Sequence, residues 1–356
     1  MALKPPSKVS VPGTLGVPSA QELGQNWTPL HDTLNTSMAW VNQAGHQPIS
    51  ALDLARTIRE TPGFDVNAIS GSGNDRLIYA AAACSLAHLQ ALQDLGADLH
   101  LRNVRGVSIM HVPSSSAVVR WLADQCVDVD ARALGWDTPL HLNARRKTAH
   151  VQALLDAGAD VHAKNDQGQA PLHALAHGHE QTEVVNASLA ALVAAGADLE
   201  ARDGQGRTAL HHAVTNYRND LICSLIHAGA DPDATDAWGL RPIQLAVSVE
   251  NELSVFALNA MGASMRGTVS KKSTLNGFLH EPRLISAIRL NSTVTMRRHL
   301  QRFPNPVPED LAAAKKFLKR RDVSNVQAVL QAHLAALAVE SVLQGAALPS
   351  LRSGPR

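Results

Sequence analysis

The sequence is poor in aromatic side chains and in cysteine, and both shortages limit what it can fold into. Aromatic residues make up 3% of the 356 residues and hydrophobic residues 45%, so Ala, Leu and Val must fill most of the core. Such a core suits thin helical layers whose backbones lie close together. The three cysteines, Cys84, Cys126 and Cys223, are scattered in helical apolar patterns without a C-x-x-C pair. They predict buried free thiols and a reducing compartment.

Long apolar runs and catalytic motifs are also missing. No apolar run reaches about 18 residues, so we expect no transmembrane segment. Residues 1–22 lack the basic-then-apolar order of a secretory signal. There is no G-x-S-x-G, P-loop, G-x-G-x-x-G or kinase motif set. We therefore expect no enzyme, no catalytic residues, no cofactor and no small-molecule substrate.

Seventeen histidines raise the question of a metal site. His173, His177 and His179 form an H-x3-H-x-H pattern, and the first two would share a helix face. No Cys or carboxylate cluster completes a zinc ligand set with them. The sequence predicts no metal.

Charge is unevenly distributed along the chain. Residues 1–264 hold 17 Lys/Arg and 26 Asp/Glu, a net charge of −9, whereas residues 265–330 hold 13 and 4, a net charge of +9. An acidic body with a basic C-terminal segment indicates how a charged partner could be attracted.

Two short phrases recur in register through the middle of the chain. The first occurs as Thr138-Pro139-Leu140-His141, Ala170-Pro171-Leu172-His173 and Thr208-Ala209-Leu210-His211. The second occurs as Gly158-Ala159-Asp160, Gly196-Ala197-Asp198 and Gly229-Ala230-Asp231. The histidines are 32 and 38 residues apart, and the glycines 38 and 33. A period of about 33 residues with T-P-L-H-x-A resembles the ankyrin repeat.

That resemblance implies an all-α solenoid of stacked helix-turn-helix units with hairpin fingers. It also implies that the histidine of each T-P-L-H hydrogen-bonds backbone in the neighbouring turn. Worn versions of the phrases extend the pattern, so we predict a flexible tail at 1–25 and an ankyrin domain of about seven repeats at 26–267. The first repeat carries about 14 extra residues, most simply between its two helices, and the fifth has about five near Glu180 to Asn186.

Beyond residue 267 the signature fades. Apolar spacing from Leu284 to Leu300 and a capping pattern at Ser324 to Gln327 predict degenerate helical pairs at 268–347 that close the stack as a C-terminal cap. A tail follows at 348–356. The basic run Lys315–Arg321 is interpreted first as the solvated end of a helix. A localisation signal or a patch for an acidic partner is the alternative.

The repeat geometry predicts where a partner protein would bind, because curved stacks expose a concave surface of fingers and inner helices. On this pattern Arg105, Gly135, Gln167, Gln205 and Trp238 lie at finger tips. The exposed inner-helix positions are Asn143, Arg145, His177, His212 and Tyr217. Trp136 stands where neighbouring fingers have glycine, so that finger must bend differently or Trp136 must protrude. Trp238 is the strongest single candidate, since Trp dominates binding hot spots.

We therefore predict a monomeric, non-catalytic scaffold or adaptor that binds a protein partner and resides in the cytoplasm, with nucleic acid not expected. The Ala-rich repeats and the Ser/Pro-rich start resemble ankyrin proteins that bacteria inject into host cells, which implies an effector secreted by a specialised system. Two alternatives stay open. One is an enzyme that modifies host proteins with its active centre in residues 268–347. The other is a basic C-terminal module for nucleic acid or an anionic membrane.

Overall fold

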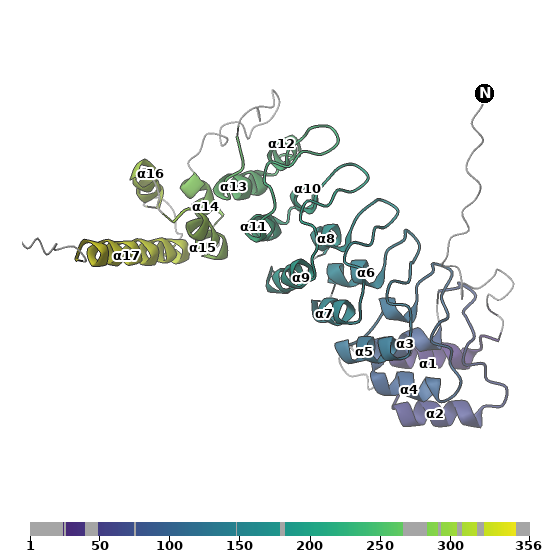
Figure 1. The fold of residues 1–356 in the computed structure, drawn as a ribbon. Helices are drawn as coiled ribbons and strands as arrows, with labels where there is room; N and C mark the ends of the chain where they lie inside the picture. Colours follow the sequence, from purple (N-terminus) through teal and green to yellow (C-terminus); the bar gives the residue numbers. More distant parts are fainter. Residues whose placement is uncertain are drawn as a thin grey trace, which may run out of the picture. The chain divides into compact units, whose positions relative to one another are not determined.

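The computed structural model describes residues 24, 26–39, 49–74, 76–146, 148–178, 182–265, 283–290, 293–304, 308–318 and 324–346. The chain divides into two compact units, Met1–Asp198 and Leu199–Arg356. Every regular element in the described part is a helix (Figure 1), so the predicted all-α class is confirmed. No helix among these residues is long and apolar enough to cross a membrane. Apart from residue 24, the predicted tails lie outside the described residues.

Among its described residues the first unit contains five helix pairs. The inner members are α1 (Pro29–Ala39), α3 (Leu77–Cys84), η1 (Ile109–His111), α6 (Pro139–Arg146) and α8 with η2 (Pro171–Ala174 and Leu175–His177). The outer members are α2 (Ala51–Glu60), α4 (Leu86–Gln93), α5 (Ser116–Asp124), α7 (Thr148–Asp156) and α9 (Thr182–Ala194). Inner elements contact the inner elements of neighbouring repeats, and outer helices do so in the pairs α2–α4, α5–α7 and α7–α9. The unit is a two-layer stack.

Each irregular repeat differs from the others only within its own helices and loops. The insertion in the first repeat falls between α1 and α2, where residues 40–48 lie outside the described part. Extra residues in the fifth repeat lengthen α9 to 13 residues, against 9 in α7. In the worn third repeat the inner helix is a single 3-10 turn.

The second unit continues with two repeats and four further helices. The repeats are α10 (Ala209–Thr215) with α11 (Asn219–Ala228) and α12 (Pro242–Ser248) with α13 (Glu252–Ala260). The further helices are α14 (Arg283–Arg289), α15 (Thr293–Arg302), α16 (Pro308–Leu318) and α17 (Ser324–Ala346).

These last four helices lie in the segment predicted to form degenerate helical pairs that close the stack as a C-terminal cap. The first two attach to the outer layer, because α14 packs on α13 and α15 on α11. The last two pack on the first two, α16 on α14 and α17 on α15. Asn259 donates a hydrogen bond to the Ser286 hydroxyl at 2.9 Å, and Arg298 donates to the Ser224 hydroxyl at 2.7 Å. The cause is a core around Ala260 that includes Leu284 and Leu300, so the apolar faces of α14 and α15 are buried at the end of α13.

In four of the repeats a histidine links the repeat to the next one. In the fourth repeat the Thr138 amide donates to His141 Nδ1 at 3.2 Å, and His141 Nε2 lies 2.9 Å from the Gln169 carbonyl. Because Nδ1 accepts, Nε2 carries the proton and donates, so the imidazole is neutral. The same bridge runs from His31 to Asp65, from His111 to Asp137 and from His211 to Leu240. The role implied by the ankyrin resemblance is confirmed.

The Gly-Ala-Asp phrases turn the chain from outer helix to finger. Gly158 has a φ of +88°, which only glycine adopts freely. Two residues later the Asp160 carboxylate accepts a hydrogen bond from the His162 amide at 2.9 Å. The turn is thereby fixed by local bonds, as expected for an Asx turn.

The prediction of three buried thiols is wrong for Cys126. Cys223 is buried, Cys84 is partly exposed and Cys126 is exposed. Cys126 follows the end of α5 with a φ of +57°, at the place where Gly96 and Gly158 stand in other repeats. It belongs to the left-handed turn and not to the helix, so its side chain leaves the apolar stripe.

We expect His141→Ala to destabilise the protein by about 2–4 kcal/mol, because it leaves two buried backbone groups without their partner. The free energy of unfolding is measured by urea titration. His162→Ala is the control, since His162 is exposed and its removal should change stability by less than about 0.5 kcal/mol. Equal urea midpoints for the two variants would contradict the bridging role.

Acid pH should also weaken the stack. Burial lowers the pKa of His141, His211 and His299, and it lowers that of His111 to about 4. These side chains stay neutral in the folded state and take up protons on unfolding. Their stabilisation is complete above the ordinary histidine pKa of about 6.5 and is lost as the pH falls toward about 4. Melting followed by circular dichroism should show this decline, and a melting temperature independent of pH across that window would refute it.

Candidate protein-interaction surface

The hairpin fingers are closed and joined by backbone hydrogen bonds. Within one finger the Asn165 amide donates to the Gln169 carbonyl at 3.0 Å, and the Asn165 side chain accepts from the Gln167 amide at 3.0 Å. Between fingers the Asp166 amide donates to the Gly135 carbonyl at 3.0 Å. Each tip is therefore held by its neighbour, which lowers the entropy that a binding partner would have to remove.

An apolar cluster lies on the fingers of the third and fourth repeats. We call it the first finger patch, and it consists of Val104, Arg105, Arg132, Leu134 and Trp136. Leu134 is 78% exposed and Trp136 48% exposed. The Leu134 amide donates to the Arg105 carbonyl, so the two fingers lie side by side. The Arg132 guanidinium lies 5.2 Å from the centroid of the Trp136 ring, a cation–π contact that holds the indole at the surface.

Trp136 occupies a strained position in its finger. Its φ is +61°, in the left-handed region that Gly168, Gly206 and Gly239 occupy in other fingers. Gly135 before it also has a positive φ, of +85°, which is the mark of a type II turn. The prediction that this finger bends differently is confirmed, and Trp136 is exposed as well. A bulky residue in such a backbone costs stability, which favours a role outside the fold.

A similar cluster lies in the second unit. We call it the second finger patch, and it consists of Gln205, Arg207, Trp238 and Leu240. Trp238 is 62% exposed, and the Arg207 guanidinium lies 5.6 Å from its ring centroid. The Ala237 amide donates to the Gln205 carbonyl at 3.0 Å, which joins the two fingers. Trp238 thus faces outward beside an arginine from the preceding finger.

The remaining predicted finger residues lie where the repeat pattern puts them. Arg105, Gln167 and Gln205 are exposed at their tips, and Gly135 is partly exposed in its turn. The pattern missed Val104, Leu134 and the two arginines beside the tryptophans. A signal was available, since Val104 and Leu134 stand at the second finger position, where other repeats have Asp166 and Gly204.

The prediction that Asn143 and His212 are exposed inner-helix residues is wrong, because both are buried. Asn143 is 5% exposed; it donates to the Pro139 carbonyl at 2.9 Å and bonds His150 of α7 at 3.0 Å. His212 is 6% exposed, and its Nε2 lies 2.8 Å from an Asp203 carboxylate oxygen. Both side chains brace one element of a repeat against another, so a partner cannot reach them.

The Asp203 carboxylate fixes the base of its finger. Burial alone would raise its pKa, but hydrogen bonds from His212 and from the amides of Arg207 and Gln205 lower the pKa below its usual value. The carboxylate is thus held ionised by groups of its own repeat, which marks it as structural.

Three other predicted residues differ in detail. Arg145 is partly buried, and its guanidinium forms an ion pair with the Asp137 carboxylate at 3.4 Å. His177 is partly buried too, and burial together with the Arg145 charge lowers its pKa. Tyr217 is exposed with a φ of +58°, but it lies past the end of α10, in the turn to α11. Helix periodicity failed there because α10 ends at Thr215.

In the described part of the chain no three His, Cys, Asp or Glu side chains are grouped as metal ligands. His173 is buried, and its Nδ1 accepts from the Ala170 amide at 3.1 Å. His179 lies outside the described residues.

The geometry defines the class first: a helical repeat protein whose hairpin fingers are bonded to one another and carry exposed aromatic side chains. Comparison with family models identifies the repeat. Residues 140–236 match the model for ankyrin repeats, in three copies. A search of curated proteins finds no match. Residues 140–236 are therefore ankyrin repeats, and such repeats indicate a protein–protein interaction module.

We expect Trp136→Gly to leave the free energy of unfolding within about 1 kcal/mol of the wild type. Relief of the left-handed backbone, about 1–2 kcal/mol, offsets loss of the Arg132 contact, about 0.5–1 kcal/mol. Gly206→Trp is the reverse change at the matching finger position. It should be clearly destabilising, because an added Cβ would lie 2.7 Å from the Ala237 nitrogen. Urea titration measures both, and a large loss of stability in Trp136→Gly would show that the indole serves the fold.

Proposed function

We propose that this protein is a non-catalytic scaffold or adaptor that binds a partner protein through its fingers, with the two finger patches as the main contacts. The observation that carries this proposal is Leu134 beside Trp136, both exposed on fingers fixed by backbone hydrogen bonds. Trp and Arg together form the commonest hot spots, because they bury a large area and keep a polar group. The same pair of residue types recurs at Arg207 and Trp238.

We further propose that the partner belongs to a host cell, into whose cytoplasm a bacterial secretion system delivers this protein. The support is the resemblance of the Ser/Pro-rich start and Ala-rich repeats to injected ankyrin proteins. Binding would then use a surface that is acidic overall, since residues 1–264 carry a net charge of −9.

The two alternatives have less support. The groove among the C-terminal helices is lined by Arg297, Gln301, His333 and apolar residues, and this lining contains no carboxylate, thiol or hydroxyl that could act as a nucleophile. Of the basic run, Lys315 and Lys316 belong to α16, whereas residues 319–321 lie outside the described part. Neither observation favours an enzyme or a nucleic-acid module over a binding scaffold.

The test compares what the intact chain captures from host-cell and bacterial lysates, quantified by mass spectrometry. We expect a specific host protein whose recovery falls by about tenfold or more in the double variant Leu134→Ser, Trp136→Gly, in line with hot-spot losses above about 1.4 kcal/mol. Trp238→Ala tests the second patch in the same way.

Leu52→Ser is the matched control, because Leu52 on α2 is 78% exposed, as Leu134 is, but belongs to an outer helix. Its capture should equal that of the wild type. A partner that survives both patch variants would place binding elsewhere, and a partner found only in bacterial lysate would remove the effector proposal.

A further inference from the structure

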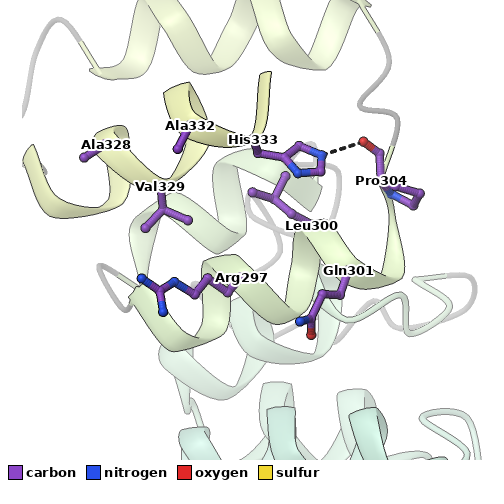
Figure 2. A pocket seen from close by; sticks show the side chains of 8 residues that line it. All are labelled: Arg297, Leu300, Gln301, Pro304, Ala328, Val329, Ala332 and His333. Carbon is purple, nitrogen blue, oxygen red and sulfur yellow. Dashed lines mark hydrogen bonds between the residues drawn. The ribbon is translucent and has the colours of Figure 1, made fainter. Parts of the chain in front are cut away.

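A groove of about 560 Å³ lies between α15 and α17, far in the sequence from the fingers (Figure 2). Its apolar wall comes from Leu300 on α15 and from Ala328, Val329 and Ala332 on α17. Figure 2 shows Val329 pointing from α17 toward α15. Leu300 is buried and belongs to the core of the C-terminal helices, so the bottom of the groove is continuous with that core.

The α17 wall is shallow enough for another helix to approach. Ala328 and Ala332 lie one helical turn apart, and both are exposed. A side chain of one carbon lets a second backbone come close, and side chains of a bound helix can then reach Val329, which is partly exposed. At the end of the groove His333 Nε2 lies 2.7 Å from the Pro304 carbonyl, which ties α17 to the second residue after α15.

The two walls differ in charge. From Ser324 to Val339 α17 has no Asp, Glu, Lys or Arg. In contrast, α14 and α15 together contain five arginines and no acid. Two of the arginines on α15 are engaged by α11, because Arg298 donates to the Ser224 hydroxyl and Arg302 to the Ile226 carbonyl. Arg297 lines the groove and is exposed, so the α15 wall presents positive charge there.

The α17 wall of the groove carries no charged side chain, so the basic edge lies beside an uncharged surface. An apolar groove with one basic edge matches an amphipathic helix that has carboxylates along one side. Charge complementarity of this kind sets the orientation of a bound helix and discriminates among partners.

We propose that the α15–α17 groove docks an acidic amphipathic helix of a partner protein. Its apolar residues contact Ala328, Val329 and Ala332, and its carboxylates lie along the edge that holds Arg297. This site is separate from the finger patches and does not depend on what they bind.

The test uses two helical peptides of about 18 residues with the same Leu/Ala face, one with Glu and one with Lys along the adjoining edge. Binding to the full chain is measured by fluorescence anisotropy at two salt concentrations. We expect the Glu peptide to bind about tenfold more tightly than the Lys peptide, with a smaller ratio at high salt. Arg297→Glu should abolish or invert that preference.

Ala332→Trp should fill the groove and abolish binding of the Glu peptide without changing the circular dichroism melt. Two matched variants should keep the binding of the wild type. Gln331→Trp adds the same bulk at an exposed position on α17 outside the groove lining. Arg56→Glu reverses an exposed arginine on α2 in the first unit. Capture by the finger patches should be the same in all four variants, so failure here and failure of the scaffold proposal are distinguishable.

Several results would overturn the docking proposal. One is no binding of either peptide, and another is equal binding of both. Binding of vesicles that contain phosphatidylglycerol, lost in both Arg297→Glu and Ala332→Trp, would make the occupant a membrane. A wild-type dimer in sedimentation that Ala332→Trp converts to a monomer would make it a second copy of this chain.

Discussion

The fold depends on one interaction, the hydrogen bond by which a buried neutral histidine joins its own repeat to a carbonyl of the next. His141 accepts from Thr138 and donates to Gln169, and His31, His111 and His211 repeat the arrangement. A solenoid has few contacts between distant repeats, so its stability is a sum over such neighbouring contacts. Because the bond needs an unprotonated ring in a dry site, it also couples folding to pH.

That constraint separates residues of the fold from residues available to a partner. The repeat pattern predicts that Asn143 and His212 are exposed, yet the side chain of each is hydrogen-bonded inside its own repeat. Trp136 is the opposite case, since it strains its turn and stays exposed. The proposed binding residues are therefore those that depart from what the stack requires, since proteins depart from local rules mostly at functional sites.

The C-terminal helices follow a different principle. Here α14 and α15 bury their apolar faces against the outer helices α13 and α11, around Ala260, Leu284 and Leu300. In turn, α16 packs on α14 and α17 on α15. The groove between α15 and α17 lies among these helices, and so the fingers and the C-terminal helices offer surfaces of different chemistry.

The sequence by itself determined the helical class, the repeat frame, the turn glycines and the finger tips, because each depends on contacts that recur about every 33 residues. It also placed Trp136 and Trp238 on fingers. Only the tertiary structure decided that Leu134 lies beside Arg105, that the Asp203 carboxylate bonds the His212 ring and that α14 packs on α13. These three contacts depend on which side chains lie next to one another and on a segment that does not repeat. A repeating sequence pattern carries no information about such contacts.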